Sequence, residues 1–420
     1  MINLPHNPLL PNHIFVPDCE AHVWVDGRIY LYGSLDIMGN RSFCSDVHHV
    51  YSSDDLVNWV DHGVAFSLAD STWAKDCGVL YAPDCCYRDG WYYLYYCVPD
   101  GRCGVAKSQS PTGPFRDVGQ LEGVWGIDPS VFVDDDGQAY IYWGQITWCK
   151  AAKLKDNMVE IIPESITQPL TVEEHEFHEG SSVKRIGDKY YYLFADTHRH
   201  GDPNREDGRP SSLGYAVSDH PLHGFKYGGI IIDNFGCDPK VWNNHGSMEC
   251  FKGQWYVFYH RSTHGSEFSR HVCAEPIFFE AGGSIREVKQ TTSGVGGPIP
   301  ATECLPASYA CELSGSVCIA AETDSYHTLA LTSMGNGDTA TFRYVAFDGE
   351  NSVTLRIRTT AKARLELYAD RAYMGEMKLR PTDGYETFTA PIQRVYGNRE
   401  LTLKLYGGEG NVAVDEMVFR

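Results

Sequence analysis

The feature that most constrains the fold is a segment that occurs five times in the first 260 residues. The copies are "DCEAHVWVDGRIYLYGS", "DCCYRDGWYYLYYC", "DPSVFVDDDGQAYIYWG", "EGSSVKRIGDKYYYLFA" and "HGSMECFKGQWYVFYH", and they begin at Asp18, Asp84, Asp128, Glu179 and His245. Each copy has a polar head residue, a short alternating strand, a turn that contains Gly, and a strand rich in aromatic residues, the pattern of a β-hairpin. Hairpins that return every roughly 45 to 65 residues are typical of β-propeller blades.

The segments between the hairpins repeat as well. "VYSSDDLVNWVDHG" follows the first hairpin and "YAVSDHPLHGFKYGG" the fourth, and each reads as two further strands. After the fifth hairpin, "RHVCAEPIFFEAGGSIREV" offers such a pair again. We therefore predict an all-β chain with a five-bladed β-propeller of four strands per blade over residues 1–292. A sandwich or irregular barrel with chance similarity is the alternative. In a propeller the first strand of each blade lines the central channel, so the five head residues would converge there.

The charge of the chain limits its possible partners, and its cysteine pattern limits the possible metal sites and disulfides. The formal net charge is -20, from 35 Lys and Arg against 55 Asp and Glu. This field repels nucleic acid and anionic membranes, so we expect neither as a partner, and it is compatible with a neutral ligand. The N-terminal residues have no signal-peptide pattern, which predicts a cytoplasmic protein or one trimmed of its signal. The 14 cysteines are scattered without zinc-like spacing, and they are either small buried hydrophobes or partly disulfide-bonded.

Carboxylates gathered in one channel have a possible chemical use. Two carboxyl groups across a sugar-sized gap can hydrolyse a glycosidic bond, one as base or nucleophile and the other as general acid. Like charges in one site resist joint ionisation, so a third carboxylate would help the acid to hold its proton. Each head residue taken alone has a simpler interpretation as a turn cap.

The five segments together resemble glycoside hydrolase family 43, which includes β-xylosidases, α-L-arabinofuranosidases and arabinanases. The resemblance covers residue 5 to about 292 and involves every blade. It implies an inverting mechanism in which Asp18 is the general base, Asp128 orients the acid and modulates its pKa, and Glu179 is the general acid. The base and acid carboxyls would then lie roughly 6.5–9.5 Å apart, which leaves room for a water molecule. At the first head, "PDCEAH" replaces the family's commoner "ADP", so Asp18 is a less secure match than Glu179.

The resemblance also implies residues around the reacting carboxyls. His245 matches a channel histidine that approaches Ca²⁺ in many relatives, and it is either near such an ion or a hydrogen-bonded core histidine. Arg261 matches a pocket arginine, unless it ends its strand at the surface. Trp73, Tyr81 and Asp84 are candidates for substrate binding, although Tyr81 stands where many relatives have Trp. Pocket or core positions are also expected for Trp125, Trp143 and Gln145. No organic cofactor is implied.

The last 120 residues have a different character. "TTSGVGGPIPATE" is linker-like, and we place the linker at residues 293–300. Short strands between turn signals then predict a β-sandwich (jelly-roll) domain over residues 301–420. This part resembles family-6 carbohydrate-binding modules, in which Asn411 would correspond to a sugar-binding loop residue. Tyr309, Tyr326 and Tyr385 are possible sugar platforms. The domain either binds sugar or stabilises the propeller.

The leading expectation is an exo-acting enzyme that releases terminal α-L-arabinofuranose or β-D-xylose from plant-cell-wall oligosaccharides. The sequence does not decide between the two sugars, because loop shape separates a furanose from a pyranose. The alternative from another class is a non-catalytic, glycan-binding propeller. Within the enzyme class, an exo-galactanase and an endo-arabinanase are further alternatives.

Overall fold

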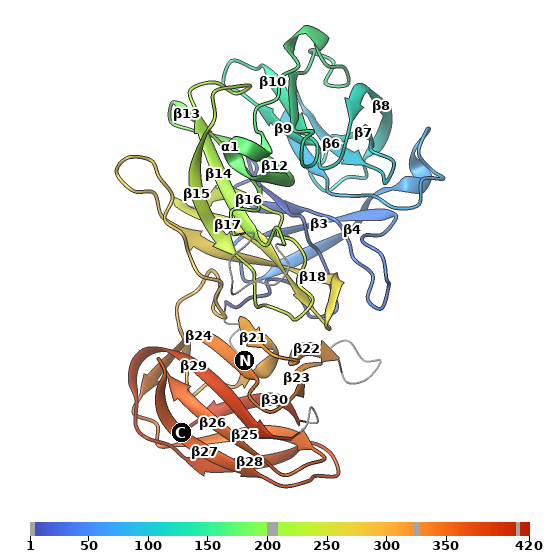
Figure 1. Cartoon of the computed structure of the whole chain (residues 1–420). Coiled ribbons are helices and arrows are strands. Elements are labelled where there is room, and N and C mark those ends of the chain that lie inside the picture. Colours follow the sequence, from blue (N-terminus) through green and yellow to red (C-terminus); the bar gives the residue numbers. More distant parts are fainter. Residues whose placement is uncertain (1–4, 200–208, 322–327, 409–411) are drawn as a thin grey trace.

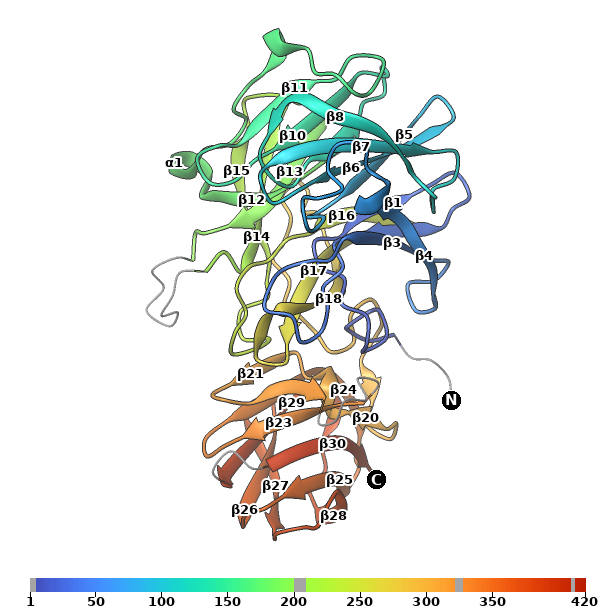
Figure 2. The same ribbon diagram turned by 90° about the vertical axis from the view of Figure 1, so that its right-hand side faces the viewer.

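The computed structural model describes residues 5–199, 209–321, 328–408 and 412–420. Strands arranged in seven sheets dominate these residues. The first five sheets form a propeller, and the last two form a separate sandwich below it in Figure 1. A view turned by 90° shows the same division (Figure 2). The predicted fold class, a five-bladed propeller followed by a β-sandwich, is confirmed.

Three blades have four antiparallel strands in sequence order. Blade I contains β1 (Glu20–Val23), β2 (Ile29–Tyr32), β3 (Val47–Ser53) and β4 (Trp59–Ser67). Blade II contains β5 (Asp84–Arg88), β6 (Trp91–Cys97), β7 (Arg102–Ser108) and β8 (Arg116–Trp125). Blade IV contains β12 (Phe177–Ile186), β13 (Lys189–Asp196), β14 (Ser212–Ser218) and β15 (Lys226–Asp233).

The prediction of four strands is wrong for blades III and V, which have three each. Blade III contains β9 (Ser130–Val133), β10 (Ala139–Trp143) and β11 (Lys150–Lys153). Blade V contains β16 (Ser247–Phe251), β17 (Gln254–Thr263) and β18 (Ser266–Ile277). In blade III the expected fourth strand makes only isolated bridges, such as Leu154 to Ile161. Four short helices complete the described elements: η1 (Leu68–Asp70), η2 (Pro163–Ser165), α1 (Val172–His175) and η3 (Ala307–Tyr309).

The N-terminal segment occupies the free edge of blade V. The Leu9 amide donates to the Val272 carbonyl at 2.9 Å, and the Asn7 side chain bonds both backbone groups of Ala274. An exposed strand edge has unpaired backbone groups, and this segment covers them in place of a fourth strand. Blade V therefore contains residues from both ends of the propeller sequence.

Hydrophobic clusters join the blades into a ring. Each pair of neighbouring blades shares one cluster of buried aromatic and aliphatic side chains, and the cluster that includes Leu31 and Phe258 joins blade I to blade V. The Ser247 hydroxyl closes the same seam, because it donates to the Cys19 carbonyl and accepts from the Ala21 amide. The repeated tyrosines of the hairpins are thus packing residues between blades.

The C-terminal domain consists of two six-stranded sheets packed face to face around one core. One sheet contains β19 (Ile299–Pro300), β21 (Glu312–Ser314), β24 (Thr339–Asp348), β26 (Ala363–Ala369), β27 (Ala372–Leu379) and β29 (Tyr396–Gly407). The other contains β20 (Leu305–Pro306), β22 (Cys318–Ala321), β23 (Leu329–Met334), β25 (Ser352–Thr359), β28 (Glu386–Pro391) and β30 (Val412–Phe419).

The segment expected to be a linker is bound to the sandwich. The amides of Thr292 and Ser293 both donate to the Arg343 carbonyl, and Ile299 already belongs to β19. Tyr309 stacks on His6 of the N-terminal segment, with ring centroids 4.1 Å apart. Of the other suggested sugar contacts, Asn411 and Tyr326 lie outside the described residues, and Tyr385 lies beneath the Arg356 guanidinium.

All 14 cysteines are free thiols, and ten of them are buried, as expected for small hydrophobic residues. Among the described residues no helix is long and apolar enough to cross a membrane.

Candidate active site

One cavity of ≈ 300 Å³ brings together most of the predicted site residues. Asp18, Asp128, Glu179, His245 and Tyr81 all line it. It is completed by Phe43, Cys44, Ala82, Pro99, Ile127, Gln145, Trp242, Asn243 and Arg270. Four of the five blade heads therefore meet in one place, as the propeller prediction requires.

Local backbone geometry directs the carboxyl groups into this cavity. Asp18 and Asp128 both precede the first strand of their blade, and both have φ 56. Aspartate is among the few residues that adopt this left-handed conformation readily. Glu179 lies within β12, where the pairing with β13 shifts register between Glu179 and Ser182. The next residue, Gly180, has φ 71, and a side chain there would lie 2.9 Å from the His245 ring. The bend thus needs glycine for conformation and for space.

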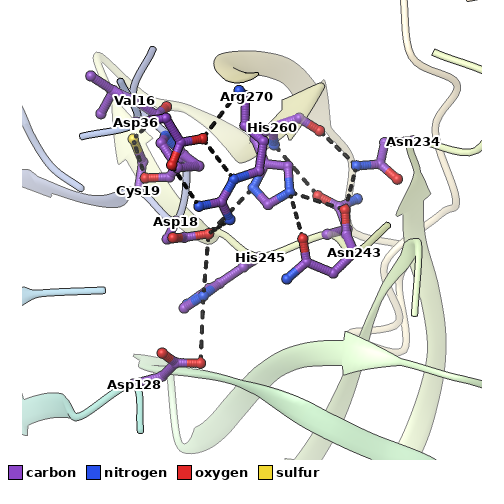
Figure 3. Close-up of polar contacts among 12 residues, drawn as sticks. Val16, Asp18, Cys19, Asp36, Asp128, Asn234, Asn243, His245, His260 and Arg270 are labelled. Atoms are coloured by element: carbon purple, nitrogen blue, oxygen red, sulfur yellow. Dashed lines mark hydrogen bonds and ion pairs between the residues drawn. The ribbon is translucent and has the colours of Figure 1, made fainter. Parts of the chain in front are cut away.

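Asp18 has a positively charged environment (Figure 3). Its Oδ1 lies 2.9 Å from Arg270 Nη1 and 3.5 Å from His260 Nδ1. Burial alone would raise the pKa of Asp18, but the charge of Arg270 leads the interactions that outweigh it and hold the pKa below its ordinary value. Asp18 is therefore ionised, as a general base must be.

Arg270 is itself fixed by a second carboxylate. Its Nε and Nη2 donate to the two oxygens of Asp36 at 2.9 and 3.0 Å, and both residues are buried. This two-point contact fixes the plane of the guanidinium and directs its remaining nitrogen at Asp18.

Glu179 lies between two side-chain amides. Gln145 Nε2 donates to Oε2 and Asn243 Nδ2 donates to Oε1, each at 2.7 Å. A half-turn of either amide would present its oxygen instead, which can accept a hydrogen bond from a protonated carboxyl group. The two amides can therefore hold Glu179 in position in both of its protonation states.

Asp128 differs from Asp18 in its electrostatics. Burial and the negative charge of Glu179 raise the pKa of Asp128 well above its ordinary value, so the two carboxyl groups resist joint ionisation. His245 lies between the two aspartates, with Nδ1 3.7 Å from Asp18 Oδ1 and 3.8 Å from Asp128 Oδ2. Burial lowers the pKa of His245, which keeps the ring neutral. The cavity thus contains an ionised carboxylate at Asp18 and, apart from it, a carboxyl group at Asp128 whose pKa is raised.

The profile of glycosyl hydrolases family 43 matches residues 5–285, about two thirds of the chain. The chain belongs to glycosyl hydrolase family 43. A xylosidase/arabinosidase from Thermoclostridium stercorarium is 30% identical to it, over 97% of this chain and 97% of the relative.

Solved structures of family 43 have the same fold. A β-xylosidase/α-arabinofuranosidase from a compost microbial metagenome, in complex with xylotriose and calcium-free, is 29% identical with a TM-score of 0.59 and covers 68% of this chain and 98% of its own. An arabinoxylan arabinofuranohydrolase from Bacillus subtilis, in complex with cellotetraose, is 24% identical with a TM-score of 0.59 and covers 98% of this chain and 97% of its own. At that identity the second structure shows the fold alone, but it does so across both domains.

Two of the residues that the family resemblance suggested for substrate binding lie away from the cavity. Trp73 packs in the core between blades I and II, with its ring stacked on Tyr96 at 6.0 Å and the Arg102 guanidinium over its face. Arg261 bonds to the Tyr259 hydroxyl and to the Thr291 carbonyl near the domain junction. Neither side chain lines the cavity.

The Asp84 side chain also lies outside the cavity and bonds to other residues. Its carboxylate accepts hydrogen bonds from His22, the Ser130 hydroxyl and the Val131 amide. It therefore connects blades I, II and III, and it does not line the cavity.

Asp84 also belongs to a group of residues that could bind a metal ion. Among the described residues, only Glu20, His22 and Asp84 bring three ligand atoms within 4.8 Å of one another, and His245 does not belong to that group. His22 is already saturated: Nδ1 lies 3.2 Å from Lys184 Nζ, which can only donate, so the Nε2 proton goes to Asp84 at 2.7 Å. The Lys184 ammonium also bonds to Glu249 at 2.8 Å and supplies positive charge there.

The expected calcium at His245 fits poorly as well. The nearest carboxylate oxygen, Asp18 Oδ1, already accepts from Arg270, whereas calcium prefers six to eight oxygen ligands. The donors around His245 are therefore not arranged for calcium.

Sequence reasoning missed Arg270, Asn243 and Trp242. The signal for Asn243 was present, since it lies two residues before the head residue His245 in "NNHGSM". Trp242 precedes it directly, within the loop that leads to the fifth blade. Gln145 was expected to shape the pocket, and the structure adds its contact with Glu179.

Proposed function

We propose that this chain releases terminal α-L-arabinofuranose or β-D-xylose from plant-cell-wall oligosaccharides, by hydrolysis with inversion at the anomeric carbon. The observation that carries the proposal is the contrast between two carboxyl groups in one cavity. Asp18 is paired with Arg270, whereas Glu179 is held by amides beside a second carboxyl group, Asp128. One group suits the role of base and the other the role of acid.

In the proposed mechanism, Asp18 takes a proton from a water molecule that attacks the anomeric carbon. Glu179 gives its proton to the glycosidic oxygen, and the bond to the leaving group breaks. Asp128 lies in the same cavity as Glu179, and the two carboxyl groups resist joint ionisation. The two protein groups that exchange protons with water and substrate, Asp18 and Glu179, both belong to this chain.

The size of the cavity supports an exo-acting enzyme. Its ≈ 300 Å³ is at the lower end of the range of about 300–1,000 Å³ for ligand pockets, and suits a terminal sugar more than a long chain. The presence of all three carboxyl groups in one cavity disfavours the non-catalytic alternative. The names of the relatives include both xylosidase and arabinosidase, so both sugars remain in the proposal.

The test compares nitrophenyl α-L-arabinofuranoside with nitrophenyl β-D-xyloside as substrates for the wild type, Asp18→Ala and Glu179→Ala. Asp18→Ala should lose activity on every substrate. Glu179→Ala should lose much less on a dinitrophenyl glycoside than on a methyl glycoside, because a good leaving group needs little protonation. Proton NMR of the first product formed should show inverted configuration. Undiminished hydrolysis in both variants would overturn the assignments.

We further propose that Lys184 takes the place of a cation in the channel and that hydrolysis does not depend on calcium. The basis is that Lys184 donates to His22, Glu249 and the Ala21 carbonyl, and thus joins blades I, IV and V. Burial opposes the charge, yet the carboxylates of Glu249 and Glu20 raise the pKa of Lys184, so the ammonium stays charged.

A further inference from the structure

Trp242 combines two properties that a buried or purely structural tryptophan lacks. It lines the cavity, and 39% of its surface is exposed. Its chain neighbours Val241 and Asn243 are buried, at 2% and 8% exposure. A large apolar ring that is presented to solvent at a concave polar site is a common feature of ligand recognition.

The backbone on both sides of Trp242 is anchored. The Val241 amide donates to the Asp238 carbonyl at 3.2 Å. The Asn243 carbonyl accepts from Asn234 Nδ2 at 2.9 Å and lies 3.0 Å from His260 Nε2. The backbone that carries the ring is therefore held in place before any ligand arrives, which lowers the entropic cost of binding to it.

The position of the ring identifies the part of the substrate that would meet it. Asn243, the next residue, donates to Oε1 of Glu179, the proposed acid. The acid protonates the glycosidic oxygen, so the leaving group lies on its side of the cavity. Near Asp18 the cavity is lined by Phe43, whose ring lies 4.8 Å from the Arg270 guanidinium. Trp242 is thus the cavity-lining neighbour of the residue that holds the proposed acid.

We propose that Trp242 is the platform on which the first sugar of the leaving group stacks. The inference rests on the proposed function and deepens it: the enzyme selects glycosides whose leaving group is itself a sugar ring, such as a xylose unit of a xylan chain. The flat ring gives apolar contact to the faces of a pyranose, whereas a methyl group in the same place is too small to cover it. Binding energy from this sugar is expected to assist the chemical step as well as affinity.

The experiment measures kcat/KM for two substrates with the same terminal sugar, whichever the wild type releases faster. One is a di- or trisaccharide and the other is the methyl glycoside. Both have poor leaving groups that need protonation by Glu179, but only the first has a sugar to stack. Trp242→Ala should lower the ratio of the two kcat/KM values about tenfold or more, the effect expected when an aromatic anchor is truncated. Trp242→Phe should keep most of the ratio.

Matched controls separate stacking from indirect effects. Trp148→Ala removes a tryptophan that is 51% exposed but does not line the cavity, and its ratio should equal that of the wild type. Asn243→Ala should slow both substrates alike, because it acts on the acid. An unchanged ratio in folded Trp242→Ala, or equal losses on both substrates as in Asn243→Ala, overturns the inference. A wild type inactive on both substrates would instead refute the proposed function, whatever Trp242 does.

Discussion

Replacement of Arg270 by methionine tests the electrostatic part of the site most directly. At 2.9 Å, unit charges on Arg270 and Asp18 attract by about 6 kcal/mol if the effective dielectric constant is about 20. A change of about 1.4 kcal/mol moves a titration by one pH unit. The loss of this interaction should therefore move the acidic limb of the kcat/KM profile upward by more than one pH unit.

The sign follows from the direction of the present shift. The pKa of Asp18 is held below its ordinary value, so its ionised form stabilises the fold above the pKa of the unfolded chain, and this stability is lost as pH falls through the lower folded value. Without Arg270, burial dominates and Asp18 binds a proton at higher pH. The base is then lost at a pH where the wild type is active.

The single substitution also leaves Asp36 buried without its partner, at a cost of about 3–5 kcal/mol in unfolding free energy. Asp36→Asn combined with Arg270→Met avoids that charge and should recover part of the stability, while it keeps the displaced acidic limb. Arg270→Lys retains the charge and should leave the limb close to its wild-type position. The assay is the pH profile of kcat/KM with a nitrophenyl glycoside, and the melting temperature confirms folding. If the folded double variant has the wild-type acidic limb, the account of Asp18 is wrong.

Three further predictions concern the acid, the bend in β12 and the metal. Asn243→Ala or Gln145→Ala should lower kcat on methyl glycosides by roughly 10- to 100-fold, the worth of one hydrogen bond to a charged group, and steady-state kinetics will show whether either amide is dispensable. Gly180→Ala should lower the free energy of unfolding, measured in urea, by about 1–3 kcal/mol. The control Gly187→Ala should lower it less, because φ there is also positive (63) but nothing lies within 4 Å of the added carbon. Equal losses in the two variants would assign the effect to backbone strain alone. Chelator treatment should leave activity and melting temperature unchanged, and a loss that calcium restores would contradict the role given to Lys184.

The ring of blades could be predicted because the hairpins repeat a local pattern. Each hairpin has a strand of alternating apolar and polar residues, a turn with glycine and an aromatic strand. When the copies are aligned with one another, the head residue of each copy falls at the same position. The strand count of blade V could not be read in this way. The partner of β18 is the segment around Leu9, more than 250 residues earlier in the chain, and only the closed ring brings the two together.

The choice between Arg261 and Arg270 shows a second limit. In β17 and β18, Arg261 is opposite His271 and Ser262 is opposite Arg270. Successive residues of a strand point to opposite faces, so the two arginines leave the same hairpin in opposite directions. Which face points toward the channel depends on a register that no local pattern reveals. The predicted sugar contact of Trp73 could not be judged from the sequence for a related reason. A tryptophan in a loop can pack against the neighbouring blade as readily as against a sugar, and the local pattern is the same.

The same hairpin explains why the ends of the chain matter for the base. Arg270 belongs to β18, whose outer edge is covered by the N-terminal segment through Leu9. On the opposite face of the hairpin, Arg261 bonds to Thr291, next to the residues that attach to the sandwich. Both contacts fix the strand pair that directs the Arg270 guanidinium at Asp18, and a misplacement of about 1 Å is enough to impair catalysis. The segments outside the five repeats therefore contribute to the proposed chemistry through the position of one arginine.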